Sequence, residues 1–165
     1  MLPARLLTEN RPVLSMILIA VTCVFVAGCS ANAFKNLKVR VDASPVRVNG
    51  LDFLVFTLAA FNTGNDDINL RFSSGMQFDF VVVSGDTEVW RESHNKASIM
   101  ILTELDIPCD ELVVHSAVWD GKDFLGVKVP PGEYEVFGEI LTTPKIRTDK
   151  VVFYWPGDQD KIREF

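Results

Sequence analysis

Apolar and polar side chains alternate with a period of two along most of the chain after residue 36, and this pattern limits the fold more than any other feature of the sequence. Val39 and Val41 alternate with charged neighbours, and residues 68–72 and 133–140 repeat the pattern. Successive side chains of a β-strand point to opposite faces, so this period indicates strands with one buried face. No segment of ten or more residues has a convincing helical period. The sequence therefore predicts an all-β domain.

Turn residues separate the predicted strands at regular intervals. Asn, Asp and Gly tolerate positive φ and gather at residues 62–66, while Ser84-Gly85-Asp86 indicates a β-hairpin. Residues 52–61 are nearly all apolar, which is typical of a central strand buried on both faces. The strands that we expect lie at residues 37–41, 52–61, 68–72, 78–82, 87–91, 98–105, 111–119, 133–140 and 151–155. Eight or nine short strands favour a β-sandwich, with a barrel as the main alternative.

The first 28 residues have the features of an export signal. Residues 16–28 carry no charge, and this run of 13 is shorter than the ~20 residues that a membrane-spanning helix needs. The run fits the apolar core of a secretory signal peptide, with Arg5 and Arg11 on its N-terminal side. It ends in Val26-Ala27-Gly28-Cys29-Ser30, which resembles the lipobox of bacterial lipoproteins. The alternative is a buried apolar helix with an incidental Cys.

The lipobox resemblance implies a signal peptide over residues 1–28, a lipid on Cys29 and a lipidated tether over residues 29–36. Lipoproteins of this kind carry two or three acyl chains, palmitate among them, and one chain alone anchors a protein only marginally. We therefore expect a chain that is exported and lipid-anchored to the bacterial cell envelope. The residue after the Cys is Ser30, which implies the outer membrane if the source has two membranes.

Cysteine and histidine are scarce in the expected mature chain. Cys23 lies in the segment that export would remove and Cys29 takes the lipid, so only Cys109 remains. A single thiol cannot form an internal disulfide, and we expect Cys109 to be inert and partly buried. His94 falls in a polar loop and is expected to be solvated, whereas His115 lies inside an apolar strand and is expected to be half-buried.

Charge and motif content exclude several classes of function. Asp and Glu outnumber Lys and Arg by 22 to 16, and a chain with a formal net charge of −6 repels phosphate backbones, so nucleic acid is not an expected partner. The sequence lacks a nucleophile elbow, a zinc-binding H-E-x-x-H and a phosphate-binding Gly loop. Ser73, Ser74, Asp79 and His94 make a poor hydrolase set, and residues 65–67 indicate a turn rather than a Ca²⁺ site. We expect no enzyme, no metal and no cofactor.

A set of aromatic, Ser, Gly and charged residues follows a specific order along the predicted domain. Its members are Phe72, Ser73, Ser74, Gly75, Asp79, Phe80, Val89, Trp90, Arg91, Trp119, Gly132 and Tyr134. This order and spacing resemble the BsuPI family, the intracellular proteinase inhibitor domain, over roughly residues 37–142. The resemblance implies an immunoglobulin-like antiparallel β-sandwich of about 7–9 strands, which we place at residues 37–156, and it implies inhibition of a serine protease.

The motif residues are expected to be structural rather than protease contacts. The large apolar members lie in predicted strands, where core packing is their expected role, and Gly75 and Gly132 suit backbone turns. As a hypothesis, Asp79 accepts hydrogen bonds from the backbone of residues 73–75. The protease-contact residues and the oligomeric state are not assigned, because no sequence pattern points to them.

Two functions remain open from the sequence. The first is a membrane-anchored proteinase inhibitor that binds a serine protease outside the cytoplasm. The alternative is an envelope lipoprotein, a scaffold or protein-binding module that has lost inhibition. The alternative is favoured by Glu92, which stands where the family prefers a second Trp, and by the conflict between an export signal and a family named for the cytoplasm.

Overall fold

The computed structural model describes residues 34–94, 96–156 and 163–164, and within these ranges the chain is built from β-strands without a helix. None of the described residues belongs to a helix that could cross a membrane. The strands are β1 (Leu37–Val48), β2 (Leu51–Asn62), β3 (Ile68–Phe72), β4 (Phe78–Ser84), β5 (Thr87–Arg91), β6 (Thr103–Ile107), β7 (Leu112–Trp119), β8 (Gly132–Ile140), β9 (Ile146–Arg147), β10 (Val151–Trp155) and β11 (Arg163–Glu164). The predicted all-β class is confirmed.

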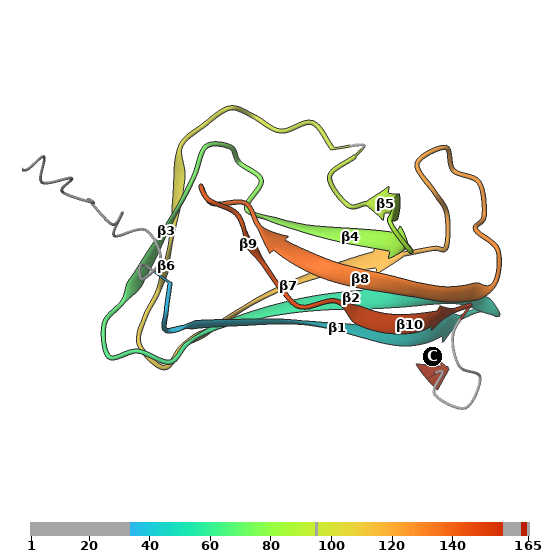
Figure 1. The fold of residues 1–165 in the computed structure, drawn as a ribbon, viewed down its shortest axis with the longest axis horizontal. Helices are drawn as coiled ribbons and strands as arrows, with labels where there is room; N and C mark the ends of the chain where they lie inside the picture. The colour runs from blue at the N-terminus through green and yellow to red at the C-terminus, as the bar shows by residue number, and fades with distance from the viewer. Residues whose placement is uncertain (1–33, 95, 157–162, 165) are drawn as a thin grey trace, which may run out of the picture.

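Two sheets face each other across the core, and a smaller sheet lies at one end (Figure 1). The first sheet has the strand order β11-β1-β2-β7, and the second has the order β10-β8-β4-β5 with β9 paired to β8. The small sheet consists of β3 and β6. The described strands therefore form separate sheets rather than one closed barrel, which confirms the predicted sandwich.

Aromatic rings fill the space between the two sheets. The ring of Phe56, on β2, is fully buried. Its centroid lies 5.8 Å from that of Phe80, 6.1 Å from Trp90, 6.2 Å from Trp119 and 5.6 Å from Phe153. Aromatic pairs at such distances contribute ~0.5–1.5 kcal/mol each beyond the burial of their surface. Because these rings come from five different strands, they join the two sheets into one core.

The central strand β2 has two unlike faces, and the expectation that both are buried is wrong. Leu54, Phe56 and Leu58 are buried, but the residues between them are only partly buried. The outward side chains of β2 lie beside those of the paired strand β7, where Val114 and Val118 are 53% and 60% exposed. No further layer of described residues covers this face.

Several strand boundaries differ from the sequence prediction. The hairpin of β4 and β5 is confirmed, with Gly85 at a φ of 58° in its turn. Of residues 98–105, only the last three enter a strand, because β6 begins at Thr103. The two-residue strands β9 and β11 were not predicted, and β11 pairs parallel with β1. Strands of two residues leave no period in the sequence, so the alternation cannot reveal them.

Candidate functional site

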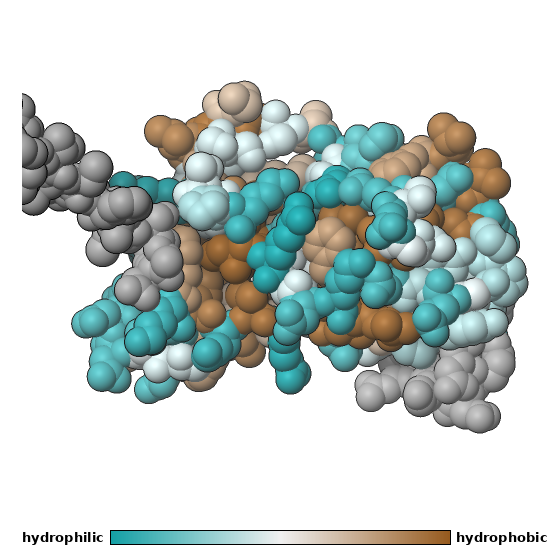
Figure 2. All heavy atoms as spheres, in the orientation of Figure 1, coloured by the Kyte–Doolittle hydropathy of each residue, from teal (hydrophilic) through white to brown (hydrophobic). Residues whose placement is uncertain are grey.

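The chain crosses from one end of the sandwich to the other between β5 and β6, and residues 97–102 of this connection belong to no strand. We call these residues the crossover segment. Its large apolar side chains are all exposed: Met100 and Leu102 are 88% and 85% exposed, and Ile99 and Ile101, which also line a cavity, are 76% and 54% exposed. Figure 1 shows the segment beside the connection between β3 and β4, and Figure 2 shows apolar atoms on the molecular surface along that side. The segment is therefore an exposed apolar feature held at the surface.

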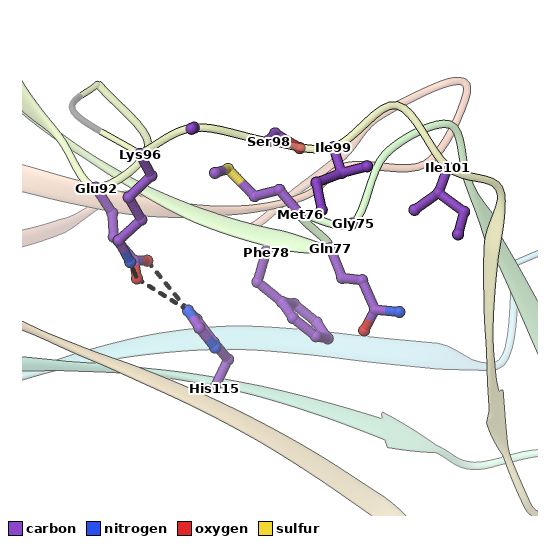
Figure 3. A pocket seen from close by; sticks show the side chains of 11 residues that line it. Gly75, Met76, Gln77, Phe78, Glu92, Lys96, Ser98, Ile99, Ile101 and His115 are labelled. Carbon is purple, nitrogen blue, oxygen red and sulfur yellow. Dashed lines mark hydrogen bonds and ion pairs between the residues drawn. The ribbon is translucent and has the colours of Figure 1, made fainter.

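A cavity of about 540 Å³ lies beneath the crossover segment. Figure 3 shows Phe78 and His115 on the side of the cavity away from Ile99 and Ile101. The rings of Phe78 and His115 are stacked, with centroids 5.2 Å apart and an angle of 15° between their planes. This stack continues the aromatic core toward the segment, so the cavity has a mainly apolar base.

Glu92 fastens the first end of the connection. Its carboxylate lies 3.1 Å and 3.3 Å from Nε2 of His115 and also pairs with the Lys96 ammonium (Figure 3). Burial raises the pKa of Glu92, but the hydrogen bonds from His115 and Lys96 outweigh this effect, so the pKa lies below its usual value. The carboxylate is therefore held ionised in the end of the sandwich.

Hydrogen bonds with the connection between β3 and β4 hold the rest of the crossover segment. The Gly75 N–H donates to the Ile99 carbonyl at 3.0 Å. The Thr103 hydroxyl donates to the Ser74 carbonyl at 3.2 Å. The Ile101 N–H also donates to the Ile99 carbonyl, at 3.0 Å, which closes a three-residue turn with Met100 at its centre. The segment is thus anchored at both ends and near its middle.

A second feature gathers the polar motif residues from three separate stretches of sequence. The motif residues Ser73, Ser74, Asp79 and Arg91 line one cleft of about 530 Å³, together with Ser93 and residues 141–145. We call it the motif cleft. The buried Asp79 carboxylate accepts hydrogen bonds from the Ser93 N–H at 3.0 Å, the Ser93 hydroxyl at 2.6 Å and the Arg91 guanidinium at 2.9 Å. These contacts tie the start of the connection after β5 to β4.

The hypothesis that Asp79 bonds the backbone of residues 73–75 is wrong. The side chain of Ser74 instead bonds the backbone of Met76, and Asp79 turns to Ser93 and Arg91. Asp79 and Ser73 line the same cleft, so the two lie in the same region although the predicted hydrogen bond is not formed.

A second buried carboxylate, which sequence reasoning missed, lies beside Asp79 on the neighbouring strand. Glu139, on β8, lies directly opposite Asp79 in the β4–β8 pairing and is fully buried. It accepts hydrogen bonds from Lys145 at 3.0 Å, Arg91 at 3.0 Å and Arg147 at 2.7 Å. Burial raises the pKa of Glu139, but the hydrogen bonds from Lys145 and Arg91 outweigh it, so the pKa is lowered. The sequence showed Glu139 as an ordinary outward residue of an alternating strand.

Arg91 joins these two carboxylates and is itself held by a third. Its guanidinium donates to Glu88 at 2.9 Å and 3.0 Å, and a single nitrogen reaches both Asp79 and Glu139. The hydrogen bonds that Arg91 donates to Glu88 are the largest cause of its raised pKa, and the contacts with Asp79 and Glu139 add to it against the opposing effect of burial. The cluster balances charge, and we read it as a structural fastening.

The apolar motif residues lie in or against the core. Phe72, Phe80, Trp119 and Tyr134 are buried, while Val89 and Trp90 are partly buried and pack against the core. Gly132 begins β8, and its neighbour Tyr134 donates its hydroxyl to the Pro130 carbonyl at 2.7 Å.

The exposure of the two histidines and of Cys109 can be compared with the sequence predictions. His94 is exposed as expected, although its ring packs on Phe124, and His115 is half-buried as expected. Cys109 is exposed, so the expectation of partial burial is wrong; it follows β6 at a bend where the chain leaves the small sheet. Cys29 and Ser30 lie outside the described residues. Within the described part of the chain, no group of three or more His, Cys, Asp or Glu residues could hold a metal ion.

The fold and these two features define a class of protein: an all-β, sandwich-like domain that presents an anchored apolar segment at its surface. The chain belongs to the BsuPI family, described as intracellular proteinase inhibitor, which matches residues 40–145. The match runs from β1 to the residue before β9 and includes both the crossover segment and the motif cleft. The family resemblance drawn from the motifs is confirmed.

Comparisons with individual proteins add little to what the family match shows. No curated protein matches the chain. The chain is similar to a Pseudomonas fluorescens alkylpurine DNA glycosylase solved with DNA, at 12% identity and a TM-score of 0.42, over 78% of this chain and 30% of the glycosylase. It is similar to a β-glucosidase from Listeria innocua, at 12% identity and a TM-score of 0.35, over 72% of this chain and 15% of the enzyme. The chain therefore spans less than a third of these larger proteins, and their activities do not transfer to it.

Proposed function

We propose that this protein is a lipid-anchored proteinase inhibitor that binds a serine protease outside the cytoplasm. The observation that carries the proposal is the BsuPI match over residues 40–145, a family described by proteinase inhibition. Inhibition of this kind needs no catalytic group, because a surface that is already ordered can occupy the protease at a low entropic cost. A usual footprint is ~800 Å² on each partner.

The proposed location rests on the sequence before the described residues. Residues 1–28 form the proposed signal peptide, Cys29 the lipid attachment point, residues 29–36 the tether and residues 37–156 the inhibitor domain. Ser30 supports the outer membrane for a source with two membranes. A lipid-anchored inhibitor would meet proteases at the membrane surface, so we propose an envelope or extracellular target rather than a cytoplasmic one.

Inhibition is tested by titrating the full-length protein, purified in detergent, against a panel of bacterial and digestive serine proteases. We expect a stoichiometric loss of activity for at least one protease. Detergent and heat-unfolded protein serve as controls. Undiminished activity of every protease at a large excess of the protein would contradict the inhibitor function.

The lipid anchor has its own test. Cells that express the wild-type chain or Cys29→Ala are grown with labelled palmitate, and the chain is then recovered from membrane and soluble fractions. We expect label and membrane recovery for the wild type and neither for the variant, because acylation requires the thiol of Cys29. Equal labelling of the two chains would contradict lipid attachment at Cys29 and would leave the proposed inhibition unaffected.

The second candidate is a protein-binding module that has kept the sandwich and lost inhibition. The observation that favours it is Glu92, where the family prefers Trp: its carboxylate points into the end of the sandwich and pairs with His115 and Lys96. We propose Glu92→Trp as the discriminating variant. If inhibition appears only in this variant, the loss-of-inhibition function is supported; if the wild type already inhibits, it is contradicted.

A further inference from the structure

We propose that the crossover segment, residues 97–102, enters the substrate cleft of the target protease and that Met100 fills its primary specificity pocket. The target is therefore a serine protease with an apolar primary pocket. This inference rests on the proposed inhibitor function and adds to it the contact segment and the class of partner. It is argued from the exposure, backbone, charge and anchoring of the segment.

Exposure singles out Met100. At 88% it is the most exposed large apolar side chain of the described residues, and Leu102, in the same segment, is 85% exposed. Such side chains are costly to leave in water unless a partner covers them. The neighbours Ile99 and Ile101 are also exposed, at 76% and 54%, but they line the cavity beneath the segment, so Met100 and Leu102 are the apolar side chains left outside it.

The backbone of the segment is available for pairing. Among the described residues, its backbone–backbone hydrogen bonds use the Ile99 carbonyl and the Ile101 N–H, and the groups of Met100 and Leu102 are not among them. Free N–H and C=O groups on either side of such a turn can pair with a strand edge of a partner. The crossover segment can therefore present main-chain groups together with Met100.

Charge selects the class of protease. Residues 97–102 contain no charged side chain, and the nearest cation, Lys96, is paired with Glu92. An acidic primary pocket of the trypsin type would be left without a partner for its carboxylate, whereas a hydrophobic pocket of the chymotrypsin type accepts a Met side chain. The segment thus fits a protease with an apolar primary pocket and offers no cation to an acidic one.

Anchoring on both sides lowers the cost of binding. Glu92 holds the connection at His115, Gly75 holds Ile99, and Thr103 binds Ser74 at the start of β6. A segment whose ends are already fixed loses less conformational freedom when it enters a cleft. The same anchoring keeps Met100 at the centre of its turn.

The loop between β7 and β8 is the main rival, because its Leu125 is 86% exposed. That loop is a closed turn: the Asp123 carboxylate accepts hydrogen bonds from the backbone N–H groups of Leu125 and Val127, and the Asp123 carbonyl accepts one from Gly126. Its backbone donors are thus used internally, and they are not free to pair with a protease strand. Leu125 therefore serves as the matched comparison for Met100.

The test compares inhibition constants of the full-length protein and its variants against chymotrypsin and trypsin, whose primary pockets are hydrophobic and acidic respectively. We expect the wild type to inhibit chymotrypsin and not trypsin. Met100→Asp should raise the inhibition constant by roughly 100-fold, as loss of a central contact does, while Leu125→Asp should change it by less than about threefold. Met100→Lys should transfer inhibition from chymotrypsin to trypsin. Far-ultraviolet circular dichroism and thermal unfolding should match the wild type for all three variants, because both positions are exposed.

Each other result overturns the inference in a distinguishable way. If the wild type inhibits chymotrypsin and Met100→Asp does so equally well, the contact lies elsewhere and the inhibitor function still stands. If only Leu125→Asp abolishes inhibition, the rival loop is the contact. If the wild type inhibits trypsin alone, the assigned class of pocket is wrong. If the wild type inhibits no protease in the wider panel, the proposed function fails and the contact assignment fails with it.

Discussion

At the scale of single residues, Glu92 shows how a departure from a family pattern can be accommodated. The pattern prefers a large aromatic ring at this position, whereas Glu92 brings a carboxylate that is only 9% exposed. A buried charge is costly unless it has partners, and His115 and Lys96 supply them. Glu92 and His115 lie 23 positions apart in the sequence, and only the fold shows that their side chains are in contact.

The first prediction concerns the buried carboxylate of Asp79. Asp79→Ala removes the acceptor for the Ser93 N–H, the Ser93 hydroxyl and the Arg91 guanidinium. Loss of one member of a buried ion pair typically costs ~3–5 kcal/mol, so we expect a fall of that order in the free energy of unfolding, measured by urea denaturation.

Asp106→Ala is the matched control for Asp79→Ala. Its carboxylate accepts one hydrogen bond from Asn69 at an exposed site. Exposed contacts of this kind contribute ~0–1 kcal/mol, so the control should stay close to the wild type. Equal stability losses in the two variants would show that burial of Asp79 is not what matters.

The second prediction concerns pH and Glu139. Its pKa in the folded protein is lowered from the usual 4.5, so the unfolded chain binds a proton at a higher pH than the folded protein does. The stability that Glu139 contributes is therefore full above about pH 4.5 and is lost as the pH falls through the lower pKa of the folded state. Glu139→Gln should be less stable at pH 7, and the gap to the wild type should narrow toward pH 3.

The pH effect is measured by urea denaturation of the wild type and Glu139→Gln at several values between pH 7 and pH 3. The informative quantity is the difference between the two free energies of unfolding at each pH, because other acidic groups affect both chains alike. A difference that stays constant across the range would contradict a lowered pKa for Glu139.

At the scale of secondary-structure elements, the hydrophobic period predicted most of the longer strands. It failed at the crossover segment because Ile99, Met100 and Ile101 have the composition of a strand, yet no neighbouring strand pairs with them among the described residues. Composition reports how apolar a segment is, and only the topology decides whether a strand partner is present. The same limit explains β2, whose apolar outer face is not covered.

The polar site was less predictable than the strands. Asp79 and Arg91 stood out in the sequence because they belong to a family motif, whereas Glu139 and Lys145 lie outside it. The contacts among them depend on which strands are neighbours, namely β4 with β8 and β5. Strand order is not encoded in any local pattern, so the sequence could name part of the cluster but not assemble it.

The third prediction concerns two glycines that lie in turns. Gly85 and Gly121 both have positive φ, at 58° and 72°. An added Cβ meets nothing within 4 Å at Gly85, but at Gly121 it would overlap the Trp155 ring. Gly85→Ala should therefore cost only backbone strain, ~1–2 kcal/mol, while Gly121→Ala should cost clearly more because the ring must also move. Thermal unfolding of both variants measures the difference, and equal melting temperatures would contradict the predicted overlap.

At the scale of the whole molecule, the two main sheets have different proposed roles. β1 starts at the end that carries the small β3–β6 sheet, and the proposed tether precedes it (Figure 1). The crossover segment lies beside the connection that leads into β4, a strand of the sheet opposite β1. Attachment and proposed protease contact thus use different parts of the surface, so anchoring to a membrane need not cover Met100.

The last prediction counts thiols in the intact, native protein. Lipidation and cleavage would remove Cys23 and block Cys29, which leaves the exposed Cys109 as the one reactive thiol of the mature chain. Native protein purified in detergent from bacterial membranes should take up one maleimide per chain, and Cys109→Ser should take up none, both measured by intact mass. Cys29→Ala should keep its signal segment and with it Cys23, so it should take up two after denaturation. Two adducts on the mature wild type would mean that Cys29 is free, and no adduct on the native wild type would contradict the exposure of Cys109.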